Sequence, residues 1–175
     1  AAYLVQGHRE NKDDAANTVF NSAVVQLNAG NDQEALKEFN ALRNEFPDNK
    51  ITKIAVYYAG IINFRLGNYD ESVNDLNQFL NSGVEEDMLV QSALLTQGLA
   101  RFEQEKWQQA VELLSQFEKI PEGPLHERAR IHLALAYEKL GQPQKAEAVY
   151  KELYKRPDGI NPGMSPVNVN PSSGK

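Results

Sequence analysis

The sequence predicts an all-α chain in which about four helix-turn-helix hairpins stack side by side. The clearest hairpin spans residues 51–80, where apolar side chains recur at helical spacing through Val56 and Phe64, stop at a Leu-Gly-Asn-Tyr turn, and resume through Leu76 and Phe79. Related units recur along the rest of the 175 residues. Such a recurrence is typical of a helical repeat array, in which each unit packs against its neighbours.

Small residues at fixed positions define the repeat. One set lies early in each expected second helix, at successive separations of 37, 38 and 36 residues, and comprises Ala35, Ser72, Ala110 and Ala146. Twelve residues before each of these lies another small residue, in the expected first helix, and this set comprises Ala23, Gly60, Gly98 and Ala134. Small side chains let two antiparallel helix backbones approach closely. We therefore expect both sets to pack the two helices of each hairpin together.

The first half of the chain gives two hairpins. We expect the ordered array to begin at Asp13, because acidic residues stabilise a first helical turn, and the first helix to stop near Gly30. The second helix then runs over 32–46 and ends before Pro47. Residues 1–12 form a flank with an apolar start and basic residues after it, typical either of a juxtamembrane segment or of a frayed helix start. The second hairpin ends at a turn around Gly83.

The second half gives two more hairpins and a tail. The third runs over 87–120, with residues 103–106 in place of the usual turn glycine and Trp107 in place of the aromatic Tyr69. The fourth spans 125–155, with Pro143 at the start of its second helix, where proline is tolerated. Pro157 closes the repeat domain, which we place at 13–157. Residues 158–175 are rich in proline, glycine, asparagine and serine, which predicts an extended tail.

Charge and composition exclude several classes of function. The formal net charge is −6, and no cluster of lysine and arginine offsets it, which argues against nucleic acid or an anionic membrane surface as the main partner. Cysteine is absent, which removes disulfides, thiolate metal sites and a cysteine nucleophile. No stretch approaches the roughly 20 apolar residues of a membrane-spanning helix.

No catalytic or metal-binding motif is present. His126 lies in a stretch similar to a zinc-protease helix, but the position of the second histidine is Arg130, and His132 falls on another helical face. The acidic residues at 85–87 lack the alternating ligands of a calcium loop and are explained as a first helical turn. We therefore expect a protein without enzyme activity, cofactor or metal.

The order of small residue, turn, aromatic residue and small residue resembles the tetratricopeptide (TPR) repeat. The resemblance implies a right-handed superhelical array (α-solenoid) whose first helices line a concave surface. The positions that project inward would lie three before, one after and four after the small residue of each first helix. Applied here, they give Phe20, Val24, Leu27, Tyr57, Ile61, Phe64, Leu95, Leu99, Phe102 and Ile131, followed by Leu135 and Glu138.

All these inward positions except Glu138 are apolar or aromatic. One interpretation is a groove that binds an amphipathic helix or an unfolded apolar segment of a partner. The alternative is that the protein covers this surface itself, through tight curvature, dimerisation or its own tail. The tail could supply Ile160, Met164, Val167 and Val169, and we expect it to contact the concave face of the same or a neighbouring chain unless it is simply a flexible terminus.

At family level the array resembles the membrane-anchored periplasmic TPR proteins related to the ancillary subunit of the bacterial Sec translocon. The matching features are the flank and alanine-rich first helix of residues 1–30, Gly60, the Gly67-Asn68-Tyr69 turn, Gly98 and Ala110. This resemblance implies a periplasmic protein, anchored in the inner membrane by a segment outside this chain, that contacts the translocon or chaperones.

The combined expectation is a non-catalytic interaction module with a chaperone-like role in protein export or envelope assembly. The alternative is a structural scaffold that covers its own groove and assembles complexes through an acidic outer face.

Overall fold

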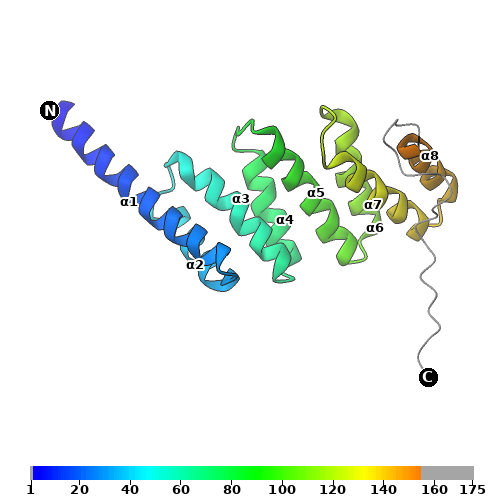
Figure 1. Ribbon diagram of the computed structural model, residues 1–175, viewed down its shortest axis with the longest axis horizontal. Helices are drawn as coiled ribbons and strands as arrows, with labels where there is room; N and C mark the ends of the chain where they lie inside the picture. Colours follow the sequence, from blue (N-terminus) through cyan, green and yellow to red (C-terminus); the bar gives the residue numbers. More distant parts are fainter. Residues whose placement is uncertain (1, 155–175) are drawn as a thin grey trace, which may run out of the picture.

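The protein is a single row of antiparallel helix pairs (Figure 1). The computed structural model describes the backbone of residues 2–154 and the side chains of residues 11–153. In chain order the elements are α1 (Ala2–Asn28), α2 (Asp32–Glu45), α3 (Lys50–Arg65), α4 (Tyr69–Leu80), α5 (Asp87–Glu103), α6 (Trp107–Leu114), the 3-10 helix η1 (Ser115–Lys119), α7 (His126–Lys139) and α8 (Pro143–Tyr154). No strand occurs within that range, which confirms the all-α array of hairpins.

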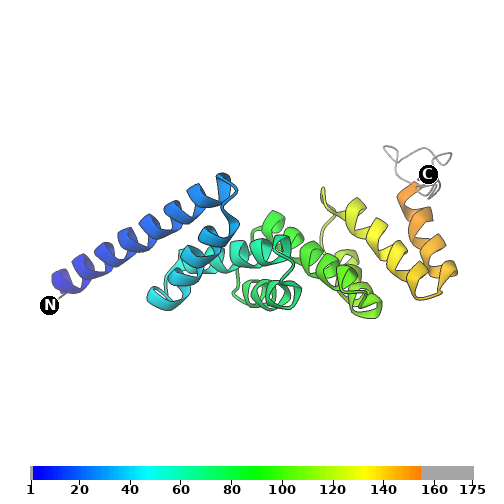
Figure 2. The same ribbon diagram turned by 90° about the horizontal axis from the view of Figure 1, so that it is seen from below.

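The odd-numbered helices form one row and the even-numbered helices form a second row behind it (Figures 1 and 2). Each even-numbered helix packs against the odd-numbered helix that follows it, and successive odd-numbered helices also contact one another from α1 to α7. Within the described chain, the backbones of successive even-numbered helices do not approach each other in this way, and α2 reaches α4 only through its Arg43 side chain. The array is therefore tighter on the side of α1, α3, α5 and α7, which is the inner side of its curve.

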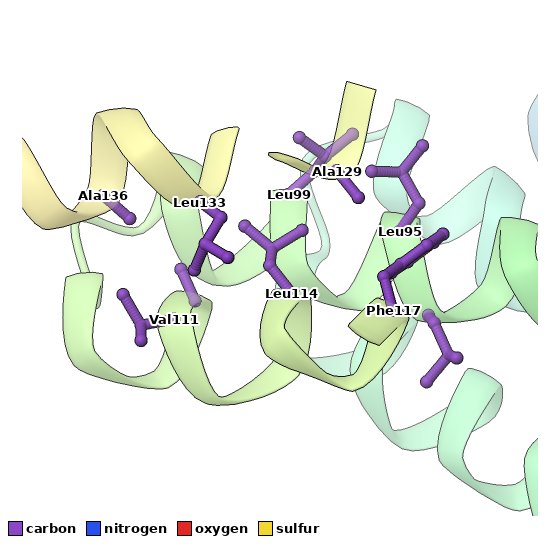
Figure 3. Close-up of a cluster of buried hydrophobic side chains, with 10 residues drawn as sticks. Leu95, Leu99, Val111, Leu114, Phe117, Ala129, Leu133 and Ala136 are labelled. Carbon is purple, nitrogen blue, oxygen red and sulfur yellow. The ribbon is translucent and has the colours of Figure 1, made fainter. Parts of the chain in front are cut away.

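The core consists of three clusters, one at each junction between hairpins. At every junction a fully buried alanine of the next first helix packs among large side chains of the preceding hairpin, namely Ala55, Ala93 and Ala129. Figure 3 shows the last junction, where Ala129 and Leu133 of α7 face Leu95, Leu114 and Phe117. A repeat array has no central core, so these neighbour contacts carry its stability.

Within each hairpin the small residues occupy the line where the two helices cross. All eight are buried: Ala23, Ala35, Gly60, Ser72, Gly98, Ala110, Ala134 and Ala146. A Cβ atom added to Gly60 would lie 2.6 Å from Leu76 Cγ, and one added to Gly98 would lie 2.5 Å from Leu114 Cδ2. Both leucines belong to the junction clusters, so the close approach in one hairpin also positions the contact with the next.

Three turns between paired helices use a glycine with positive φ, and one does not. Gly30 and Gly67 have φ of 79° and Gly141 has φ of 68°, while Glu105 takes the equivalent position in the third hairpin with φ of 56°. The chain therefore keeps the same turn without glycine, and an L-residue in this left-handed conformation costs roughly 1–2 kcal/mol.

One predicted boundary is wrong. The first helix begins at Ala2 rather than at Asp13, because no proline or turn signal interrupts residues 2–13, so Asp13 is not in a first turn. Its carboxylate instead accepts a 2.7 Å hydrogen bond from Asn49 Nδ2, which ties α1 to the linker before α3. The third hairpin ends at Lys119, within a residue of the expected end, but its last part is the 3-10 helix η1, which carries Phe117 into the core.

Polar contacts link neighbouring hairpins as well. Arg43 of α2 donates to Asp75 Oδ1 of α4 at 2.7 Å, and Asn63 Nδ2 of α3 donates to Asp75 Oδ2 at 2.9 Å, so the buried Asp75 carboxylate joins three helices. Between α4 and α5, Arg101 donates to Asp70, whose pKa is lowered by this hydrogen bond and a further one from Gln104. These contacts fix the relative positions of hairpins that apolar packing alone holds less specifically.

His126 closes the linker before α7. Its side chain is buried. The Gly123 N–H donates a 3.0 Å hydrogen bond to His126 Nδ1, so the ring proton lies on Nε2, which donates a 3.0 Å hydrogen bond to the Phe117 carbonyl. Arg130, on the next turn, binds Glu118 of η1 and Glu122 of the same linker. His126 is thus a packed structural residue, as the sequence suggests, and His132 contacts the ring of Phe102 at a centroid distance of 5.7 Å.

We expect Gly98→Ala to lower the free energy of unfolding by about 1–3 kcal/mol, the usual cost of overpacking, because the new methyl group meets Leu114. Urea denaturation followed by circular dichroism measures the change. Leu114→Val or Leu114→Ala should lower the free energy of unfolding less in the Gly98→Ala background than in the parent, because the shorter side chain removes the atoms that the new methyl group meets. Ser22→Ala, at an exposed position of α1, is the control. An unchanged stability of Gly98→Ala would contradict the close approach.

Glu105→Gly should stabilise the protein by up to about 1 kcal/mol, because glycine adopts the positive φ of this turn without steric strain. The same denaturation experiment measures it. The matched control is Gly67→Glu, which should be destabilising at the equivalent turn. A loss of stability in Glu105→Gly would show that the side chain makes a contact worth more than the strain.

The ion pair at Asp70 should make stability depend on pH. The pKa of Asp70 is lower in the folded state than in the unfolded state. The ionised carboxylate therefore stabilises the fold fully at pH values above the unfolded-state pKa of about 3.9. This contribution to stability is lost as pH falls through the folded-state pKa. Asp70→Asn should therefore have a lower Tm than the parent at pH 7, and the difference should shrink toward zero as pH falls below about 3.9. A difference independent of pH would rule out the charge as its cause.

Candidate protein-binding surface

The structure separates the ten predicted groove residues into two groups. Seven are partly exposed along the inner row of helices: Phe20, Val24 and Leu27 on α1, Ile61 and Phe64 on α3, Phe102 on α5 and Ile131 on α7. The remaining three, Tyr57, Leu95 and Leu99, are buried, with exposed fractions of 8%, 3% and 6%. We call the seven partly exposed residues the inner strip.

The three buried residues are core residues because the next first helix covers them. Leu95 and Leu99 pack with Ala129 and Leu133 of α7 (Figure 3). Tyr57 packs with Phe79 and Ala93, and its hydroxyl donates to Ser92 Oγ of α5 at 2.8 Å. Burial raises the pKa of this hydroxyl, so it stays protonated as a donor. A partner cannot reach these three side chains while the hairpins are stacked.

The aromatic members of the inner strip are held by further rings. Phe20 lies edge-on to Phe39 at a centroid distance of 5.6 Å, and Phe102 lies edge-on to Trp107 at 4.8 Å. Phe64 contacts Tyr69 at 5.6 Å in the position equivalent to the Phe102–Trp107 pair. These contacts restrict the rings, which favours binding because little side-chain freedom remains to be lost.

Two residues near the strip were not predicted. Tyr58 is partly exposed and stacks on Phe39 at 5.3 Å with an interplanar angle of 12°. Trp107 is partly exposed at the start of α6, beside Phe102. Tyr58 falls two residues before Gly60, outside the three inward positions, so the repeat pattern did not select it. The sequence placed Trp107 only at a turn. Its ring contact with Phe102 in the structure shows that it lies next to the inner strip.

Widely exposed apolar side chains are scarce within residues 11–153. The large apolar residues classed as exposed are Val25, Leu66 and Met88, and none belongs to the inner strip. The strip is therefore narrow and only partly open to solvent, not a broad apolar patch.

Other kinds of site do not occur in the described part of the chain. Across the described residues, no three histidine, aspartate or glutamate side chains come together in a way that could hold a metal ion. None of the helices in this part combines the length and the apolarity needed to cross a bilayer.

Stacked hairpins with an inner row of partly exposed apolar side chains define a helical-repeat protein, a class whose extended surfaces bind other proteins. Residues 17–49 and residues 95–162 each match a family model described as tetratricopeptide repeat. The chain is therefore built from tetratricopeptide repeats, as the sequence predicts, and such a scaffold is in general a non-catalytic interaction module. No curated protein matches the chain.

Solved structures share the fold. A fragment of MamA from Desulfovibrio magneticus RS-1, from residue 41 to its end, superposes with a TM-score of 0.69 at 18% identity, covering 90% of this chain and 85% of that one. A structure titled "Crystal structure of MamA protein" gives 0.67 at 17% identity and covers 88% and 82%. A tetratricopeptide repeat protein from Parabacteroides merdae ATCC 43184 gives 0.56 at 16% identity and covers 90% and 62%. At these identities the likeness establishes the fold alone.

Proposed function

We propose that the inner strip binds an amphipathic helix or an unfolded apolar segment of a partner protein, without catalysis and without a cofactor. The observation that carries the proposal is that partly exposed apolar side chains recur on every first helix, from Phe20 on α1 through Phe64 and Phe102 to Ile131 on α7. Partly exposed apolar side chains on every hairpin suit a partner that lies along the array.

The physics of the strip favours a partner with a few large apolar anchors. Binding energy in protein interfaces concentrates in a few well-packed aromatic contacts surrounded by residues that exclude water. Phe64 and Phe102 are such rings, already fixed by Tyr69 and Trp107. An apolar partner side chain placed between neighbouring first helices would bury the open side of these rings at low entropic cost.

The setting we propose is the bacterial periplasm, with the translocon, chaperones or exported chains as partners and a membrane anchor upstream of residue 1. This part rests on the sequence resemblance to the ancillary Sec subunit family. Its test is separate from that of the strip: fractionation and protease accessibility of the natural protein in cells should place the repeat domain outside the inner membrane. Recovery in the cytoplasm would leave the strip proposal intact and remove the export role.

Phe64→Gln and Phe102→Gln should each weaken partner binding about tenfold or more, because an aromatic anchor typically contributes more than about 1.4 kcal/mol. The partner is first captured in cells by a photo-crosslinker at position 64 or 102, with Val25, an exposed apolar residue outside the strip, as the control position. The captured protein is then titrated against the variants.

Leu66→Gln, at an exposed apolar residue in the turn after α3, is the matched control and should bind normally. Circular dichroism must show that the variants remain folded, because Phe64 and Phe102 also pack against the core of the third junction. Capture confined to this chain itself, or variants that unfold globally, would contradict a working binding surface.

A second candidate function is a scaffold that uses its outer, even-numbered helices. The burial of Tyr57, Leu95 and Leu99 by neighbouring hairpins favours it, since part of the inner face is already covered. Exposed acidic residues on the other row, Glu34, Glu71 and Glu112, would then make the contacts. Replacing these three with glutamine would abolish partner binding on the scaffold reading and leave it unchanged if the inner strip is the binding surface.

A further inference from the structure

Every hairpin carries four large apolar side chains at equivalent positions. They lie three before and one after the small residue of the first helix, and four and seven after the small residue of the second helix. The four sets are Phe20, Val24, Phe39 and Leu42; Tyr57, Ile61, Leu76 and Phe79; Leu95, Leu99, Leu114 and Phe117; and Ile131, Leu135, Tyr150 and Leu153.

In the first three hairpins the next first helix packs on the set and buries all of it except Phe20, Val24 and Ile61, which stay partly exposed. Ala55, Ala93 and Ala129 occupy the same position of α3, α5 and α7, each is fully buried, and each belongs to the cluster of the set it covers. The covered side chains seven residues after the small residue of the second helix, Leu42, Phe79 and Phe117, are at most 1% exposed. In each of these three hairpins, the apolar set thus packs against the first helix of the next hairpin.

The fourth set is the exception in the described chain, where no helix follows α8. Ile131, Leu135, Tyr150 and Leu153 are all partly exposed, although their chemistry is that of the three covered sets. We call these four residues the end face. Terminal repeats of a solenoid normally present a polar outer face to solvent. We therefore expect another polypeptide segment to pack on the apolar end face.

The opposite end of the array shows what an uncovered face looks like in this protein. The positions of α3 that pack on the first hairpin, Ile51, Ala55, Tyr58 and Ala59, correspond on α1 to Asp14, Thr18, Asn21 and Ser22. These four α1 residues are exposed. The chain has polar residues where nothing packs on α1 and keeps apolar residues on the end face.

We infer that residues 160–169 of this chain cover the end face in an extended conformation. The linkers before α5 and before α7 each contain six residues, 81–86 and 120–125. The same length after Tyr154 places the next covering segment from about residue 161 onward. The segment that occupies this place begins with Ile160 and contains Met164, Val167 and Val169.

The composition of this segment fits an apolar face and excludes a fifth helix. Residues 159–174 contain no charged side chain, in a sequence in which 24% of residues are charged. Pro162 and Pro166 lie inside the segment, and proline in a helix interior removes a backbone hydrogen bond and clashes with the preceding turn. An extended strand of ten residues can reach about 33 Å, which is more than the length of α7 over two or three turns.

The inference does not rest on the proposed partner binding. The end face lies on α7 and α8, and it shares only Ile131 with the inner strip. Covering of the end face can hold whether or not Phe64 and Phe102 bind a partner, so failure of either proposal leaves the other standing.

The test is photo-crosslinking in the purified full chain, with p-benzoylphenylalanine at Leu135 or Leu153 and, as the control, at Val25. We expect the first two positions to crosslink to the peptide that contains residues 160–169, and Val25 not to do so. Equal amounts of chain labelled with ¹⁵N and unlabelled chain are mixed before irradiation. Crosslinked peptides of a single isotope mean that the contact is within one chain. Peptides of mixed isotope mean that a second copy covers the face, and absence of any crosslink means that the face stays open; either result overturns the inference.

A matched pair of variants tests the chemistry of the contact. Met164→Ser, Val167→Ser and Val169→Ser together should reduce the crosslink at least tenfold and lower the Tm. Asn161→Ser, Asn168→Ser and Asn170→Ser together change the same number of residues in the same segment and should leave both unchanged. An undiminished crosslink in the first variant would show that the apolar side chains do not hold the segment, and the inference would fail.

Discussion

The packing of a leucine against a glycine, where the two helices of a hairpin cross, is the interaction on which the rest of the structure depends. Leu76 fills the space that a side chain at Gly60 would need, and Leu114 does the same at Gly98. The same leucines are then covered by the first helix of the next hairpin, together with Ala93 or Ala129. One side chain thus fixes the spacing within a hairpin and the contact between hairpins, which is how a short repeat propagates an array.

The packing of successive hairpins also determines which side chains remain exposed on the inner face. Residues three before and one after the small residue of a first helix lie between the inner face and the next hairpin. Where the next hairpin covers these positions, as at Leu95 and Leu99, they belong to the core; Ile61, at an equivalent position of the second hairpin, stays partly exposed. Stability of the array and area of the inner surface therefore compete for the same side chains, which explains why the inner strip is narrow.

The sequence predicted the parts of the fold that are set by local chemistry. The turn glycines and Pro47, Gly83 and Pro143 mark the ends of helices directly, so most boundaries lie within a residue or two of those expected. The start of α1 was missed because a helix with no stop signal simply continues, and the early end of α6 depends on how η1 fits against α7. The burial of Tyr57 and Leu95 was missed for a different reason: the pattern gives the side of the helix but not how closely the next hairpin packs.

The position of Ile131 joins the two surfaces that the array leaves partly open. It is the last residue of the inner strip, and it is also one of the four residues of the end face. A partner that lies along the whole strip to Ile131 and a chain segment that covers the end face would bury the same side chain. Their binding is then coupled, and because coupling free energies are reciprocal, each must weaken the other by the same factor. If both proposals hold, the covered end of the array would limit how far a partner can extend along the inner strip.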